Sequence, residues 1–231
     1  MKTQDILTLI GGSISLFVLQ IAGYNSNFLP APAAAHTLQT KSDVRKLTAQ
    51  PISGTFVQQC QQRKSLPVET RHTIDVLLSK VGTKDCKLAF GKLNSLITLD
   101  LMKNQIVDLK PLATLTNLTY LSLEDNKIVD VKSLATLTNL EALGLGGNQI
   151  VDVKPLTTLT HLTNLGLYSN KIVDVKPLAT LTNLEVLNLF GNQVVDVKPL
   201  TTLTHLTDLR LESNRISFKS CPVKPESICS F

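Results

Sequence analysis

The sequence is poor in aromatic side chains: they make up 4% of its 231 residues, and tryptophan is absent. This scarcity argues against a core assembled from mixed large side chains. Leucine, in contrast, supplies more than one residue in six, well above average usage. Because 43% of the residues are hydrophobic, the chain is not low-complexity disorder. The composition favours a core that repeats one small unit.

Long hydrophobic runs are missing beyond residue 23, so nothing later in the chain could span a bilayer. The first 35 residues contain the basic Lys2, an apolar run from Ile6 to Gly23 and a small-residue stretch ending at Ala35. This order is typical of a secretory signal peptide. We therefore predict cleavage after Ala35 and a secreted or periplasmic protein without stable membrane insertion. A membrane tether formed by an uncleaved leader is the alternative.

One motif recurs six times at a constant spacing of 22 residues. In each copy, leucines stand eight, five and three positions before an asparagine, and Ile or Val stands two positions after it. A fixed period of this length indicates a solenoid. The six asparagines are Asn104, Asn126, Asn148, Asn170, Asn192 and Asn214.

The pattern L-x-x-L-x-L-x-x-N, found over residues 96–216, resembles the leucine-rich repeat. The form with N-x-I-V-D-V-K-P-L and T-L-T is most similar to the internalin and phosphatase-regulator branch of that family. The resemblance implies an α/β repeat fold: a right-handed solenoid with short parallel strands on its concave face and a helical N-terminal cap. It also implies protein ligands, without indicating a particular one.

Simple physical rules predict how each coil is built. Residues around Leu121 and Leu123 alternate as in a short strand with its leucines facing inward. The asparagine side chain would bond backbone groups that the following turn leaves unpaired, and losing one such rung should cost about 1–3 kcal/mol. Proline suits the start of the next turn, on the convex side, and Ser133 replaces it in one copy. The four prolines are Pro111, Pro155, Pro177 and Pro199.

Cysteines are few, and none lies within the repeats. Cys60 and Cys86 precede the repeats, and Cys221 and Cys229 follow them. Pairing Cys60 with Cys86 and Cys221 with Cys229 is the only connectivity that does not cross a six-coil stack, so we predict these two disulfides. Export would provide the oxidising environment they need. A zinc site is the alternative, but spacings of C-x25-C and C-x7-C do not resemble one.

The chain is therefore expected to contain four segments. They are a signal peptide (1–35), a linker with the N-terminal cap (36–91), the solenoid of six repeats (92–220) and a C-terminal cap (221–231). Within the first cap, Pro67 should open an amphipathic helix. Its apolar face would cover the first coil, and consists of Ile74, Leu77, Leu78 and Val81.

Comparison of the repeats with one another shows which positions vary. Residues 139–160 and 183–204 differ at only 4 of 22 positions, three of which face outward from the predicted strand. Residues 117–138 and 161–182 differ at six, again including the three outward strand positions. Convex lysines and aspartates are also exposed, yet they do not vary between these copies. If exposed positions varied only because nothing constrains them, the convex lysines and aspartates would vary as well.

We therefore predict that the concave face binds a protein ligand, with Tyr168 and Phe190 as neighbouring aromatic anchors. Six strands with three outward positions each give 18 residues, close to the ~20–30 per side of a standard interface. The alternative is a structural or envelope-associated protein without a specific ligand. The predicted contact residues are Tyr120, Ser122, Glu124, Asn164, Tyr168, Asn188, Phe190, Asp208, Arg210 and Glu212.

The sequence contains few residues or motifs that indicate catalysis or metal binding. No G-x-S-x-G, H-E-x-x-H or phosphate-loop pattern is present. His161 and His205 lie two coils apart, about 10 Å, which is too far to share a metal ion. The Asp and Lys of each D-V-K should form two compensating rows of charge, with a calcium row as the alternative. We predict no enzyme activity, no cofactor and no metal site.

The formal charge of +5 is confined to one segment. Residues 36–91 hold 9 basic and 4 acidic residues, whereas residues 92–220 hold 12 of each. A nucleic-acid ligand would need a basic stripe on the binding face, so we expect none. We expect a monomer whose N-terminal cap is basic.

Overall fold

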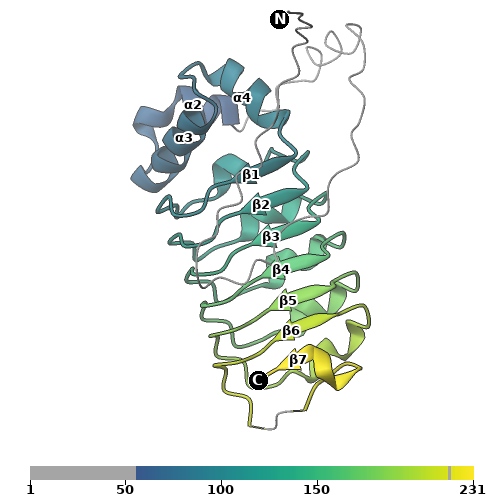
Figure 1. Ribbon diagram of the computed structural model, residues 1–231. Coiled ribbons are helices and arrows are strands. Elements are labelled where there is room, and N and C mark those ends of the chain that lie inside the picture. Colours follow the sequence, from purple (N-terminus) through teal and green to yellow (C-terminus); the bar gives the residue numbers. More distant parts are fainter. Residues whose placement is uncertain (1–55, 218–219) are drawn as a thin grey trace, which may run out of the picture.

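The computed structural model describes residues 56–217 and 220–231 of the chain. Figure 1 shows one elongated stack, with a helical cap at the N-terminal end followed by successive coils in chain order. Seven strands form one parallel sheet in the order β1 to β7. The solenoid predicted from the sequence is therefore confirmed. The predicted leader, residues 1–35, and most of the linker lie outside the described residues.

The N-terminal cap consists of helices. Helix α3 begins directly after Pro67, as predicted, and its residues Ile74, Leu77 and Leu78 are buried. Thr73 donates a 2.7 Å hydrogen bond from its hydroxyl to the backbone oxygen of Asp108, which attaches the cap to the first coil. The elements of the cap are α2 (Phe56–Gln61), the 3₁₀ turn η1 (Arg63–Ser65), α3 (Val68–Lys80) and α4 (Cys86–Asn94).

Each repeat contributes one three-residue strand. Its central leucine is buried, and every strand pairs in register with the residue 22 positions later, as Tyr120 does with Ala142 and Leu121 with Leu143. The constant spacing of the sequence thus becomes a constant register in space. The strands are β1 (Thr98–Asp100), β2 (Tyr120–Ser122), β3 (Ala142–Gly144), β4 (Asn164–Gly166), β5 (Val186–Asn188) and β6 (Asp208–Arg210).

Opposite the sheet, each coil returns through a 3₁₀ turn. Four of these turns have proline near their start, and the turn with Ser133 has the same five-residue length as the three turns that follow it. Proline is therefore favourable there but not required. The turns are η2 (Lys110–Leu112), η3 (Lys132–Thr136), η4 (Lys154–Thr158), η5 (Lys176–Thr180) and η6 (Lys198–Thr202).

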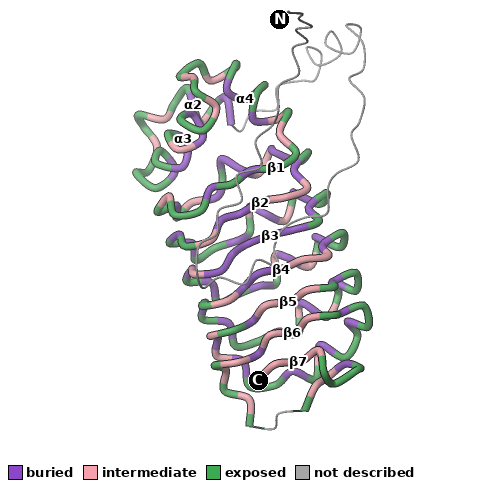
Figure 2. The backbone as a smooth tube through the Cα atoms, viewed as in Figure 1, coloured by how far each residue is buried: buried purple, intermediate pink, exposed green. Residues whose placement is uncertain are grey.

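The core runs through the stack as a continuous aliphatic column. Figure 2 shows buried residues in successive coils along the stack, and most of the buried side chains are Leu, Ile and Val. In the cap, the rings of Phe56 and Phe90 stack with centroids 6.2 Å apart. Each fully buried leucine contributes roughly 1.5–3 kcal/mol. This arrangement explains how a chain with so few aromatics can fold.

Two disulfides close the ends of the solenoid. The bonds Cys60–Cys86 and Cys221–Cys229 are both present, as predicted. The first joins α2 to the start of α4. The second closes a C-terminal segment containing the 3₁₀ turn η7 (Glu226–Ile228) and strand β7 (Cys229–Ser230). Strand β7 pairs with β6 and so covers the last coil with a seventh strand, which the sequence analysis did not predict.

Among residues 56–217 and 220–231, no helix is long and apolar enough to cross a bilayer.

Candidate functional site

The solvent-facing side of the sheet, here called the concave face, presents three columns of residues. Each column runs along the stack with one residue per coil, because equivalent residues of successive repeats lie side by side. The first column is Thr98, Tyr120, Ala142, Asn164, Val186 and Asp208, and the second is Asp100, Ser122, Gly144, Gly166, Asn188 and Arg210. The third is Met102, Glu124, Gly146, Tyr168, Phe190 and Glu212.

Backbone hydrogen bonds keep the third column in register just beyond the strands. Asp125 N donates to Gly146 O at 2.9 Å, Gly147 N to Tyr168 O at 2.8 Å, and Ser169 N to Phe190 O at 2.7 Å. At ~4.8 Å per coil, neighbours in this column are close enough for one ligand segment to contact several of them.

The third coil, which contains β3, has glycine at two positions of the concave face, Gly144 and Gly146. A Cβ atom added to Gly146 would lie 2.1 Å from Cε1 of Tyr168, and one added to Gly144 would lie 2.9 Å from Oε1 of Glu124. The Tyr168 ring from the fourth coil and the Glu124 carboxylate from the second therefore both lie over β3 and its extension. The two glycines are buried beneath these neighbours.

The second coil places Tyr120, Ser122 and Glu124 beside these two glycines. Ser122 is buried, with 2% of its surface exposed, and its hydroxyl donates to Oε2 of Glu124 at 3.4 Å. Burial raises the pKa of the Glu124 carboxyl; the charges of Asp125 and Asp100 add to this effect, and the Ser122 hydrogen bond opposes it. Burial also raises the pKa of Tyr120, with further contributions from Glu124 and Asp100 against the Ser122 hydrogen bond.

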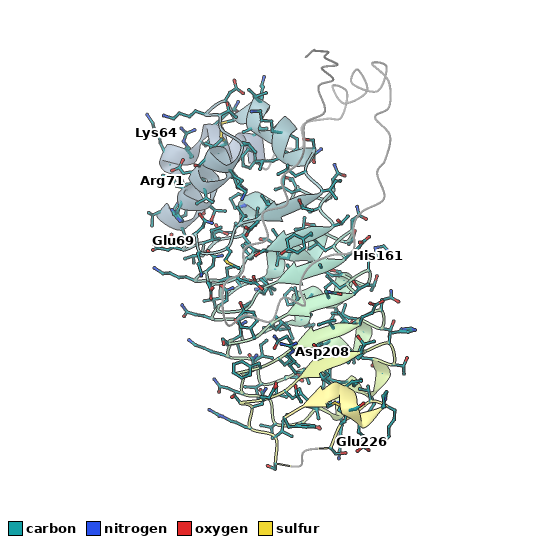
Figure 3. All side chains as sticks on the ribbon, viewed as in Figure 1. Lys64, Glu69, Arg71, His161, Asp208 and Glu226 are labelled. Carbon is teal, nitrogen blue, oxygen red and sulfur yellow. A yellow bond between two sulfur atoms is a disulfide. The ribbon has the colours of Figure 1, made fainter. Side chains whose placement is uncertain are left out.

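The C-terminal half of the concave face carries a different set of groups. Arg210 pairs with Asp208, with Nη2 3.1 Å from Oδ2, and the two side chains are equally exposed. Oε2 of Glu212 is buried and has no hydrogen-bond partner among the described residues. Phe190 is 42% exposed, a high value for so large an apolar side chain. Figure 3 shows Asp208 over the sheet, away from the turn edge where His161 lies.

The predicted contact residues thus all lie on one face, in the three columns defined above. Tyr120, Asn164, Tyr168, Asn188, Asp208, Arg210 and Glu212 are half-buried, and so is Glu124, whereas Phe190 is exposed. Ser122 is the exception because it is buried and holds Glu124 in place.

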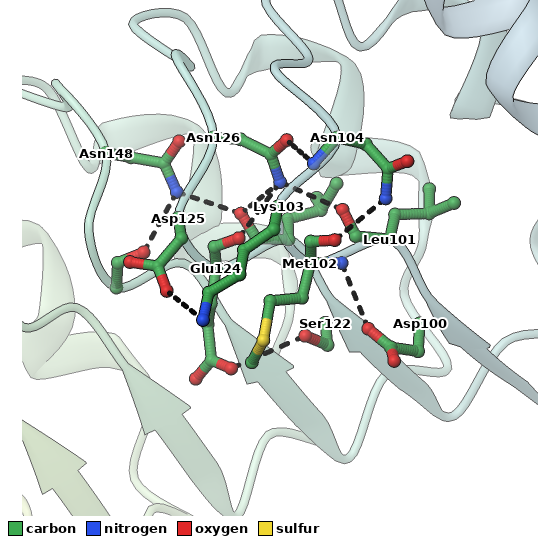
Figure 4. A network of polar contacts seen from close by, with 12 residues as sticks. Asp100, Leu101, Met102, Lys103, Asn104, Ser122, Glu124, Asp125, Asn126 and Asn148 are labelled. Carbon is green, nitrogen blue, oxygen red and sulfur yellow. Dashed lines mark hydrogen bonds and ion pairs between the residues drawn. The ribbon is translucent and has the colours of Figure 1, made fainter.

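The repeated asparagines form a ladder beneath the edge of the concave face. Figure 4 shows Asn126 between the ladder residues Asn104 and Asn148. The Asn126 amide donates to the backbone oxygens of Leu101, Leu123 and Glu124 at 2.8–3.1 Å. Its Oδ1 accepts from the backbone of Ile106 at 2.9 Å, so each such side chain joins its own coil to the preceding one. Asn148, Asn170, Asn192 and Asn214 repeat this pattern.

Asn104 is different because the cap, rather than another coil, precedes it. It is half-buried, and its amide donates to Met102 O at 2.8 Å. The first rung is therefore weaker than the others.

Histidines fill a structural position in two of the repeats. Nδ1 of His161 lies 3.0 Å from Thr138 O, and Nδ1 of His205 lies 2.9 Å from Thr182 O. The amide of Asn139 makes the equivalent bond to Thr116 O at 2.9 Å. These histidines are thus accounted for by the coil-to-coil bonding. Across the described ranges, no group of three His, Cys, Asp or Glu side chains could hold a metal ion.

The aspartates of the D-V-K sequences cap the turns. Oδ1 of Asp152, for example, accepts a 2.8 Å hydrogen bond from the backbone of Lys154, and the other copies do the same. Lys132 also forms a 3.6 Å ion pair with Asp130. This is the usual capping of a turn by a carboxylate. The constancy of these aspartates therefore has a structural cause.

A row of exposed valines was missed by the sequence analysis. In each of the first five coils, the valine three positions after the ladder asparagine is 36–53% exposed. The signal was present in the sequence, because the first and fourth residues of I-V-D-V are core positions and the valine and aspartate between them are exposed. The row consists of Val107, Val129, Val151, Val173 and Val195.

Comparison with known proteins identifies the class. The family model described as leucine-rich repeats (two copies) matches residues 94–136, 138–180 and 182–220, more than half of the chain. The chain belongs to the leucine-rich repeat family. A search of curated proteins finds no match.

Solved structures of bacterial leucine-rich-repeat proteins are similar. Internalin InlF of Listeria monocytogenes is 38% identical with a TM-score of 0.54, over 56% of this chain and 38% of that one. Internalin C2 of the same organism is 34% identical with a TM-score of 0.52, over 62% and 74%. A Leptospira interrogans leucine-rich-repeat protein is 32% identical with a TM-score of 0.51, over 61% and 36%. The chain thus spans well under half of the InlF chain.

Proposed function

We propose that the chain is an exported, non-enzymatic module that binds a protein ligand with its concave face. The contact residues would be Tyr120, Glu124, Tyr168, Phe190, Arg210 and Glu212, held rigidly by the stacked coils. Because a rigid face loses little conformational entropy on binding, such a scaffold suits recognition.

The observation that carries this proposal is the variation among repeats that otherwise keep the same sequence. Glycine, asparagine and aromatic residues replace one another in the second and third columns, while the buried leucines stay the same. The capping aspartates are constant for a structural reason. The lysines are the better comparison, because Lys154, Lys176 and Lys198 are exposed and have no ion-pair partner among the described residues. They nevertheless stay constant, so drift alone does not account for the concave differences.

Two further features support the proposal. Phe190 is exposed beside Tyr168, and exposed aromatic neighbours commonly anchor interfaces. The two disulfides favour an oxidising compartment, in agreement with the predicted leader.

A capture experiment tests the proposal. Immobilised wild type is incubated with native extract and culture fluid beside the double variant Tyr168→Ala/Phe190→Ala and a matched convex variant, Lys154→Ala/Lys176→Ala. We expect the wild type and the convex variant to recover the same protein, and the concave variant to lose it by more than tenfold. Thermal unfolding checks that all three are folded. Equal recovery by all three, or no specific protein with any, would contradict concave binding; the second result would favour a structural role.

A further inference from the structure

Acidic groups outnumber basic ones on the concave face, although the solenoid as a whole is neutral. The three columns contain Asp100, Glu124, Asp208 and Glu212 but only one basic residue, Arg210. That arginine is already paired with Asp208 at 3.1 Å. No ion pair of the described chain involves the other three carboxylates. The binding face therefore has an excess of negative charge that its own residues do not neutralise.

Two of these carboxylates enclose the aromatic residues of the third column. Along the stack the order is Glu124, Gly146, Tyr168, Phe190 and Glu212. Because Gly146 has no side chain, the Tyr168 ring lies over it and so leans toward the coil of Glu124. At the other end, Glu212 follows Phe190 by one coil, ~4.8 Å. Aromatic surface with a carboxylate beside it is thus present at both ends of the column.

This combination suits one ligand chemistry better than others. A Lys or Arg side chain packs its apolar stem and its charge against an aromatic ring and can form a charge-assisted hydrogen bond to a neighbouring carboxylate. An acidic ligand would be repelled. A purely apolar one would cover the half-buried Glu124 carboxylate and supply no opposite charge to it. A single metal ion cannot bridge Glu124 and Glu212, since four coil spacings separate them by ~19 Å.

We propose that the third column recognises a basic segment of the protein ligand, with Lys or Arg side chains seated on Tyr168 and Phe190 against Glu124 and Glu212. This inference rests on the proposed function and specifies the class of partner. The ligand segment would extend along the stack, so that successive basic residues reach the two carboxylates.

Nuclear magnetic resonance of the folded, ¹⁵N-labelled chain tests the inference. The probes are three end-blocked pentapeptides at millimolar concentration, Gly-Arg-Gly-Lys-Gly, Gly-Glu-Gly-Glu-Gly and Gly-Leu-Gly-Leu-Gly. We expect the basic peptide to shift the amide signals of Gly146, Tyr168 and Phe190, and to bind at least fivefold more tightly than the other two. Added salt should weaken this binding.

The charge is tested by Glu124→Gln, with Glu69→Gln in α3 as the matched control. The concave variant should bind the basic peptide about threefold to fivefold more weakly, and the control should bind it as the wild type does. The inference is overturned if the basic peptide shifts no concave signal, if all three peptides bind alike, or if Glu124→Gln has no effect. In each of these cases the capture experiment still decides the proposed function separately, because Tyr168→Ala/Phe190→Ala would lose its partner whatever the charge of that partner.

Discussion

At the scale of single residues, the turn before each ladder asparagine requires an unusual backbone. The preceding residue has a positive φ of 52–68° in all six coils. Glycine occupies this position in two coils, as Gly147 and Gly191, and residues with side chains occupy it in the other four. The positive φ is required by the geometry of the turn. It could not be predicted from the sequence, because the residue type at this position differs from coil to coil. A left-handed backbone costs a residue with a side chain roughly 1–2 kcal/mol.

Substitution of one of these glycines should destabilise the solenoid. In Gly147→Ala the added Cβ would lie 2.2 Å from Oδ1 of Asp125, in addition to the strained backbone. We expect the free energy of unfolding to fall by about 1–2 kcal/mol in urea titration. The control is Gly91→Ala in helix α4, where a Cβ meets no atom within 4 Å, and helix propensity should raise stability by up to about 1 kcal/mol. Equal effects of the two changes would refute this explanation.

The ionised carboxylate of Glu124 should destabilise the native state. Its pKa is raised by burial first and by Asp125 and Asp100 second, so the folded chain binds its proton more tightly than the unfolded chain does. The stability contributed by this group therefore falls as the pH rises from the unfolded pKa through the raised folded pKa. Lys103, whose Nζ lies 3.9 Å from Oδ2 of Asp125, offsets part of that neighbour's charge.

Accordingly, Glu124→Gln should be more stable than the wild type at pH 7. The difference between their free energies of unfolding should shrink as the pH falls through the folded pKa, because the wild-type carboxyl then becomes neutral as well. Urea titrations at a series of pH values measure this. A difference that is constant with pH, or that grows on acidification, would show that the charge of Glu124 is not the cause.

At the scale of elements, the structural elements that the repeat motif encodes could be predicted from the sequence. Features that depend on contacts between neighbouring coils could not. The strands, the turns and the cap helix follow from leucine spacing, proline and a fixed period. Strand β7 has two residues and no repeat motif, and it forms because the last coil offers an open edge. The lean of Tyr168 over Gly146 depends on a side-chain conformation, which the spacing of residues does not specify.

The asparagine ladder gives a prediction at this scale. Asn148→Ala removes four hydrogen bonds and leaves the buried backbone groups of two coils unpaired, so we expect a loss of about 2–3 kcal/mol. Asn104→Ala, at the half-buried first rung, should cost at most about 1 kcal/mol. Chemical denaturation of both variants measures the difference. Equal losses would mean that the contacts between coils do not determine the stability of a rung.

At the scale of the whole molecule, the stack presents two rows that could contact a partner. One is the third column of the concave face, with Tyr168, Phe190 and the carboxylates. The other is the row of exposed valines, which repeats the same residue in five of the six coils. An invariant apolar row offers little specificity, whereas the concave columns differ from coil to coil. Our proposal therefore assigns recognition to the concave face.

Photo-crosslinking distinguishes these surfaces. The photoreactive residue p-benzoylphenylalanine replaces Phe190, Val173 or Lys176 in three separate proteins, each irradiated with native extract and culture fluid and analysed by mass spectrometry. We predict a covalent adduct with one specific protein for Phe190→p-benzoylphenylalanine and none at the other two positions. An adduct at Val173 or Lys176 without one at Phe190 would contradict recognition through the concave face.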